Sequence, residues 1–234
     1  MSGRARLVGL VLLALAFDPA AAQVAPSPSE VAGYRGLFAA AASGDAGRIP
    51  ALVADGQRPD ARDARGRTPL HVAAHRGHHA AMRALATVGA DPNALDADRY
   101  DIVTIAAVAG DVPTLEVALG IGSSPRNVTS RYDGTALIAA AHLGHVEVVR
   151  TLIRAGAPLD HVNNLGWTAL IESIVLGDGG ARHTDTLRAL VEAGASVNLA
   201  DREGRTPLAL AEARGYDTMA RLLRQAGART SGAT

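Results

Sequence analysis

"GRTPLHVAAHRGH" occupies residues 66–78 of this chain, and the related stretch "GRTPLALAEARGY" occupies residues 204–216. A stretch that recurs in this way predicts internal repeats, which are sought first because they decide the whole fold. One glycine marks a nearly constant period, as Gly44, Gly77, Gly110, Gly144, Gly177 and Gly215, and only its last interval is longer. A second glycine follows five of these six at one fixed spacing, whereas Gly194 follows Gly177 later than that spacing predicts. The chain is therefore predicted to be a series of similar units, one of which carries an insertion.

The unit that contains residues 66–78 has the start and stop signals of two short helices. Thr68 can cap a helix with its side-chain oxygen, and Pro69 suits the first helical position, where no N–H is needed. Gly77 can adopt the left-handed conformation that ends a helix, and a second helix is expected from there to Gly89. Such a pair cannot bury its own apolar face, so neighbouring units must stack. Paired alanines are predicted where adjacent first helices touch, at Ala40-Ala41, Ala73-Ala74, Ala106-Ala107 and Ala140-Ala141.

The motifs of this unit resemble those of the ankyrin repeat. The resemblance is carried by "TPLHVA" at 68–73, "GH" at 77–78 and "GADPN" at 89–93, together with the spacing from Gly44 to Gly77. It implies an all-α solenoid over residues 34–228, with six stacked helix-turn-helix repeats and short hairpin tips. We expect repeats one to six at about 34–62, 63–95, 96–128, 129–162, 163–200 and 201–228. Residues 229–234 are expected to form a disordered tail.

The N-terminus has the pattern of a cleavable secretory signal. Arg4 and Arg6 precede an apolar run over residues 7–17, and small residues follow at Ala20–Ala22. That run is much shorter than the roughly 20 residues needed to span a bilayer. Residues 1–22 are therefore predicted to be a signal peptide and residues 23–33 a linker. The mature chain is expected to be periplasmic or secreted, with no transmembrane segment.

Composition excludes several classes of function. The formal net charge is zero and the pI is about 7.1, so nothing predicts nucleic acid as a partner. The chain has no cysteine and no lysine, which excludes thiol chemistry, a Walker A lysine and a Schiff-base lysine. No motif of a known catalytic class is present. We therefore expect a non-enzymatic protein with no cofactor, and its alanine-rich, arginine-only usage suggests a bacterial source.

The resemblance to ankyrin repeats implies that a protein partner binds the concave side of the stack, and the predicted export makes an envelope protein the expected partner. That side consists of the turn tips and the exposed positions of each first helix. Tyr100, Tyr132 and Trp167 fall on consecutive tips, and Trp, Tyr and Arg dominate binding energy at interfaces. The same rings could instead pack on neighbouring tips and stiffen the stack. The predicted partner-binding residues are Arg65, Arg67, His75, Arg76, Tyr100, Tyr132, His142, Leu165, Trp167, Val175, Leu176, Arg205 and Arg214.

A second hypothesis is a ligand- or metal-handling accessory protein. Four histidines crowd one unit, at His71, His75, His78 and His79. The resemblance assigns His71 and His78 to hydrogen bonds within and between repeats, so we predict no metal site there. The insertion over residues 177–185 holds Asp178, His183 and Asp185 in what reads as a mobile loop, and long loops often carry function.

Overall fold

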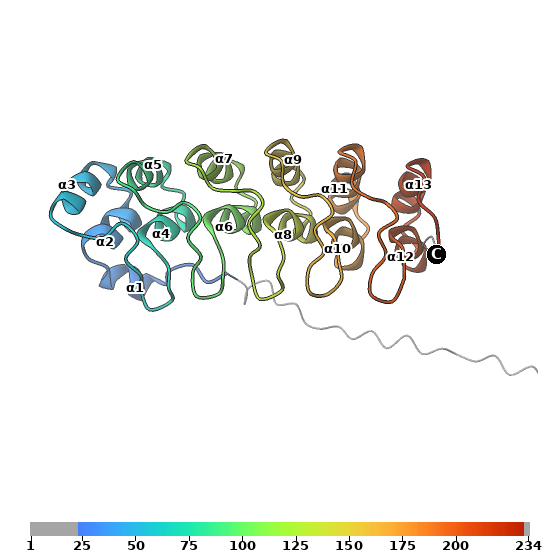
Figure 1. Cartoon of the computed structure of the whole chain (residues 1–234), viewed down its shortest axis with the longest axis horizontal. Helices are drawn as coiled ribbons and strands as arrows, with labels where there is room; N and C mark the ends of the chain where they lie inside the picture. The colour runs from blue at the N-terminus through green and yellow to red at the C-terminus, as the bar shows by residue number, and fades with distance from the viewer. Residues whose placement is uncertain (1–22, 232–234) are drawn as a thin grey trace, which may run out of the picture.

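The computed structural model describes residues 23–231, and residues 1–22 and 232–234 lie outside the described part. The predicted signal peptide and the end of the predicted tail therefore lie outside it. The described residues form an elongated stack of two helical layers, with hairpins projecting from one side (Figure 1). None of the helices within residues 23–231 is long and apolar enough to cross a membrane.

Six helix pairs make up the stack, as the period predicts. The inner layer consists of α2 (Gly36–Ser43), α4 (Pro69–His75), α6 (Ile102–Ala109), α8 (Ala136–Leu143), α10 (Ala169–Val175) and α12 (Pro207–Ala213). The outer layer consists of α3 (Ile49–Ala54, after the 3-10 turn Ala46–Arg48), α5 (His79–Thr87), α7 (Val112–Gly120), α9 (Val146–Arg154), α11 (Ala181–Glu192) and α13 (Asp217–Gln225). The remaining helix, α1 (Pro28–Gly33), precedes the first pair.

Local chemistry sets the helix ends. The Thr68 hydroxyl accepts a hydrogen bond from the backbone N–H of His71, and Asp101 caps α6 in the same way with Thr104. Gly110 and Gly144 follow α6 and α8 in the left-handed conformation, with φ of 69° and 66°. The start and stop signals predicted from the sequence are thus confirmed.

Small side chains let the inner helices approach one another. Ala41, Ala107 and Ala141 are fully buried, so the predicted alanine contacts are confirmed. Repeat five has Ser173 and Ile174 in place of the alanine pair, and the buried Ser173 hydroxyl donates to the Leu170 carbonyl one turn earlier. Glu212, in the last repeat, stays exposed and pairs with Arg224, as suits a polar end of the stack.

The hairpins between the helix pairs, which we call fingers, are joined by backbone hydrogen bonds. The Ala97 N–H donates to the Arg65 carbonyl at 3.0 Å, and the Asn164 N–H donates to the Tyr132 carbonyl at 2.9 Å. Each of these finger tips therefore rests on the next tip in the series.

At Gly66, the close contact between neighbouring fingers leaves no room for a side chain. Gly66 and Gly204 occupy equivalent finger positions, with φ of 70° and 76°, so alanine at either site costs about 1–2 kcal/mol of backbone strain. A Cβ at Gly66 would lie 2.8 Å from the Ala97 nitrogen, whereas Gly204 has nothing within 4 Å. We expect Gly66→Ala to lower the free energy of unfolding in urea by roughly 1–3 kcal/mol more than Gly204→Ala. Equal losses would show that the fingers do not stack as described.

The structure corrects two predictions about the ends of the chain. Within the predicted linker, residues 28–33 form α1, whose N-terminus is closed by reciprocal hydrogen bonds between Ser27 and Glu30. The predicted disordered tail is bonded to the last repeat over its described residues. Arg229 accepts from the Thr206 hydroxyl and donates from its N–H to Asn198 Oδ1.

The insertion in repeat five is mostly helical, so its interpretation as a mobile loop is wrong. α11 has 12 residues where α5, α7 and α9 have nine, because the extra residues extend its N-terminal turn. His183 holds this turn in place by hydrogen bonds: its Nδ1 lies 2.8 Å from Asp178 Oδ1, and its Nε2 lies 2.9 Å from the His142 carbonyl oxygen.

Candidate interaction surface

The first part of the predicted concave surface is covered by the chain's own N-terminal arm, residues 23–27. The Val24 carbonyl accepts a hydrogen bond from Arg67 Nη1 at 3.0 Å. Gln23 and Ala25 line a shallow pocket together with His75 on α4 and Val108 on α6. The face that remains open for a partner therefore begins near repeat three.

Arg67 does not form part of the exposed surface, contrary to prediction. Its side chain is only 1% exposed because the arm lies over it, and it forms ion pairs with Glu30 and with Asp63, the latter at 2.8 Å. The Tyr34 hydroxyl donates to Asp63 at 2.7 Å and completes the cluster. Arg205, the equivalent residue of repeat six, is 50% exposed since no arm covers it.

The other predicted residues divide by exposure. Tyr100 is predicted to lie on an exposed finger tip. The structure corrects this placement, because the Tyr100 side chain is only 6% exposed and lies at the base of its finger. The exposed members of the set are Arg65, Arg76 and Arg205. The half-buried members are His75, Tyr132, His142, Leu165, Trp167, Val175, Leu176 and Arg214.

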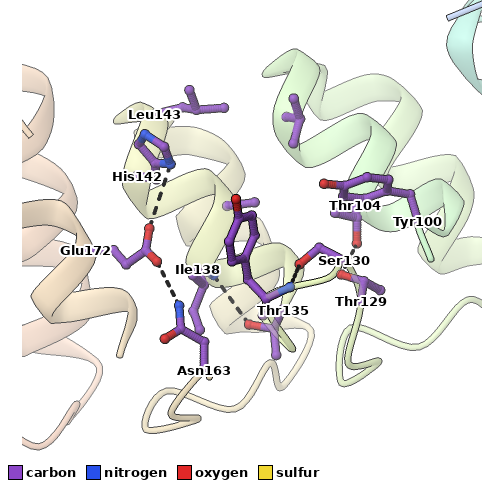
Figure 2. Close-up of a pocket in the computed structure, with 14 residues that line it drawn as sticks. Tyr100, Thr104, Thr129, Ser130, Thr135, Ile138, His142, Leu143, Asn163 and Glu172 are labelled. Atoms are coloured by element: carbon purple, nitrogen blue, oxygen red, sulfur yellow. Dashed lines mark hydrogen bonds and ion pairs between the residues drawn. The ribbon is translucent and has the colours of Figure 1, made fainter. Parts of the chain in front are cut away.

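A pocket opens on the concave face between repeats three and five, and we call it the tyrosine pocket. It brings together Tyr100, Tyr132 and His142, three of the predicted residues, and it holds about 60 Å³. Figure 2 shows Tyr100 and His142 among its lining residues. Its other lining residues are mainly apolar or small: Thr104, Val108, Thr129, Ser130, Gly134, Thr135, Ile138, Ala139, Leu143, Asn163 and Glu172.

The sequence of the first helices explains why the pocket lies here. Ala139 on α8 occupies the position that Val72 and Ile105 occupy on α4 and α6. The smaller side chain leaves room beside the fingers of repeats three and four. Glu172 occupies the same position on α10, where it borders the pocket.

Glu172 is a buried carboxyl group, with a relative exposure of 2%. Asn163 Nδ2 donates to Glu172 Oε1 at 2.8 Å, and His142 Nδ1 lies 3.7 Å from Oε2, longer than a hydrogen bond (Figure 2). Burial raises the pKa of Glu172 to about 8 and outweighs the hydrogen bond from Asn163, which lowers the pKa. The group is therefore mostly protonated at neutral pH.

Asn163 is itself held in one orientation by its finger. Its Oδ1 accepts the backbone N–H groups of Leu165 and Trp167, each at 3.0 Å. Asp63 and Asp201 cap their own fingers in the same way. The amide in repeat five keeps the cap and adds a donor for Glu172, which an aspartate could not provide.

Asn163 and Glu172 are not among the residues predicted from the sequence, although the sequence contains a signal for the pair. Glu172 is the only charged residue at its helix position, since the other five repeats have Ala39, Val72, Ile105, Ala139 and Leu210 there. Asn163 likewise replaces the aspartate of other fingers. Two departures from the repeat pattern that face one another predict a specific contact.

The histidines of repeat two have structural partners. His71 bonds Thr68 within its repeat and the Tyr100 carbonyl in the next, and His78 Nε2 lies 3.1 Å from the Ala42 carbonyl oxygen. These are the bonds that the resemblance implies. His79 Nε2 contacts the Thr114 hydroxyl at 2.9 Å. Across residues 23–231, no group of three or more histidine, aspartate or glutamate side chains is placed to hold a metal ion.

Comparison with known proteins identifies the family to which this stack of helix pairs belongs. The family model described as "Ankyrin repeats (3 copies)" matches residues 37–126 and 103–200, most of the helical stack. The chain belongs to the ankyrin repeat family. Ankyrin repeats are protein–protein interaction modules, and proteins built from them are generally non-enzymatic scaffolds.

Among curated ankyrin repeat proteins, YahD of Escherichia coli (strain K12) is 41% identical over 103 residues. That match covers 44% of this chain and 51% of YahD, so the matched region spans about half of the relative's length. The human SH3 and multiple ankyrin repeat domains protein 1 is 44% identical over 71 residues, which are 30% of this chain and 3% of that protein.

Solved ankyrin repeat structures share the whole stack. An ankyrin repeat domain from Acinetobacter baumannii AYE is 44% identical, with a TM-score of 0.77, and the match covers 82% of this chain and 98% of that one. The ankyrin repeat protein EF0377 is 31% identical, with a TM-score of 0.74 and the same coverage of both chains. The ankyrin repeat domain of Bcl-3 is 27% identical, with a TM-score of 0.75, and covers 84% of this chain and 88% of that one.

Proposed function

We propose that this ankyrin repeat protein is exported to the bacterial cell envelope and binds or modulates another envelope protein there. Binding takes place on the concave face and finger tips of repeats three to six. The observation that carries the proposal is the tyrosine pocket, a concave apolar site lined in part by Asn163, whose finger also carries the half-buried Leu165 and Trp167. A rigid, pre-formed face of this kind lowers the ordering cost of binding.

The binding surface can be tested with a paired substitution. The double variant Tyr132→Ala/Leu165→Ala removes two half-buried side chains from adjacent fingers. We expect it to reduce co-purification of the partner from envelope extracts by about tenfold or more, as loss of interface anchors does. The matched control is Glu147→Ala/Arg150→Ala, which removes an exposed pair from the outer helix α9. Equal retention by both variants, with unchanged melting temperatures, would contradict the proposed surface.

Export is tested separately by fractionation and N-terminal sequencing of the protein from its own cells. The charged start, short apolar run and Ala20–Ala22 support cleavage before Gln23. We therefore expect the periplasmic or secreted fraction to contain a chain that begins at or near Gln23. A cytoplasmic protein that keeps residues 1–22 would contradict the location while leaving the binding surface untouched.

A further inference from the structure

We infer that the tyrosine pocket receives an arginine side chain of the partner protein, with its guanidinium group bound at Glu172. This inference rests on the proposed function and names the chemistry of the contact. It depends on three features of the pocket: a carboxyl group that the fold does not need, its fixed position, and walls that suit an arginine stem.

The fold does not require a carboxyl group at this helix position. The other five repeats have apolar residues there and form the same helix pair. Burial of a carboxyl group without a cationic partner is costly. Glu172 has Asn163 as its amide partner and His142 at 3.7 Å, but burial lowers the pKa of His142 and so favours the neutral ring, and the described contacts include no arginine at the Glu172 side chain. Glu172 therefore lowers the stability of the stack. Binding of a ligand to its carboxyl group explains why a glutamate is present at this position.

The position of the carboxyl group is fixed before any ligand arrives. Asn163 is held by two backbone N–H groups of its finger and donates to Oε1. Oε2 remains 3.7 Å from His142 Nδ1, without a hydrogen bond between them. A guanidinium group can donate to a carboxylate with several N–H groups in one plane, which is the geometry that arginine provides and lysine does not.

The walls complement the rest of an arginine side chain. Ile138, Ala139 and Leu143 offer apolar contact to its methylene groups, and the two tyrosine rings offer aromatic faces. Such a face already accepts a guanidinium in this protein, since Arg131 Cζ lies 5.8 Å from the centre of the Tyr132 ring. Arg131 is exposed and is not among the lining residues, so within the lining only His142 could add positive charge.

The charge state of the pocket makes binding pH-dependent. A bound guanidinium favours the ionised carboxylate, so Glu172 must release its proton when arginine binds. The titratable or charged groups around it are His142, Tyr100, Tyr132 and Arg131. Burial lowers the pKa of His142 and raises that of Tyr100 to about 12, so neither ring titrates between pH 7 and pH 9. Affinity for arginine should therefore rise over this range.

The probe is N-acetyl-arginine N-methylamide, titrated into the isotope-labelled protein and followed by NMR. Its control is the citrulline compound, which has nearly the same shape and no charge. We expect the arginine probe to shift the side-chain amide of Asn163 and to bind at least about tenfold more tightly than citrulline. Binding should tighten about tenfold from pH 7 to pH 9. Glu172→Gln should remove both differences.

Two results would overturn the inference. One is equal binding of the two probes, and the other is unchanged arginine binding by Glu172→Gln. Co-purification separates this failure from failure of the proposed function. If Glu172→Gln keeps the partner while Tyr132→Ala/Leu165→Ala loses it, the concave face binds but not through an arginine at Glu172. If neither variant affects the partner, the proposed surface itself is wrong.

Discussion

Replacing Arg67 with alanine is expected to lower the free energy of unfolding by about 3 kcal/mol, measured by urea denaturation at pH 7. The guanidinium is fully buried and pairs with Asp63, Glu30 and the Val24 carbonyl. Its removal leaves Asp63, whose side chain is 9% exposed, without its cation. We also expect the N-terminal arm to detach, because Arg67 supplies the described side-chain bond to its backbone.

Arg205→Ala is the matched control, since Arg205 occupies the same finger position and bonds Asp201 with the same geometry. The Asp201 side chain is buried as well, but Arg205 is half exposed and its described side-chain partners are Asp201 and Glu203, with none in the N-terminal arm, so we expect a smaller loss than from Arg67→Ala. Equal losses from the two substitutions would show that the arm and α1 are not docked on the solenoid. Limited proteolysis adds an independent readout, because a detached arm should be cut faster in Arg67→Ala alone.

The second large effect concerns pH. The folded chain keeps the proton on Glu172 up to about pH 8, whereas the unfolded chain releases it near the ordinary value of 4.5. Between these values the folded state binds more protons, so the free energy of unfolding falls as pH rises and levels off above pH 8. The contribution is on the order of a few kcal/mol.

Glu172→Gln should remove this decline, because the amide cannot ionise. We expect the variant to gain stability relative to the parent between pH 5 and pH 8.5, measured by denaturation at each pH. Glu147→Gln, on the exposed face of α9, is the control for loss of a surface carboxylate and should keep the parent's decline. A parallel pH profile for Glu172→Gln and its parent would mean that Glu172 is ionised in the folded protein.

The periodic part of the fold follows from local chemistry and is therefore predictable from sequence. Threonine caps, first-turn prolines and left-handed glycines act within a few residues of where they stand. Thr68 begins its helix and Gly110 ends its helix in the structure, as the sequence predicts. The buried alanine pairs follow from the same period.

The exposure of individual side chains on the concave face is less predictable from sequence than the helix boundaries, because it depends on contacts between distant segments. Nothing local to Arg67 distinguishes it from Arg205, because what differs is the arm, which lies far earlier in the chain. The tyrosine pocket likewise depends on a small residue, Ala139, next to fingers of two repeats. The insertion reads as a loop because of its glycines, yet its later residues extend α11.

The most direct test of binding through the concave face is photo-crosslinking in the protein's own cells from two single positions. Leu143 borders the tyrosine pocket, and Arg150 is exposed on the outer helix α9. A photoreactive residue at position 143 should capture one discrete envelope protein, and the same residue at position 150 should capture none. Capture of that protein from position 150 but not from position 143 would contradict binding through the concave face.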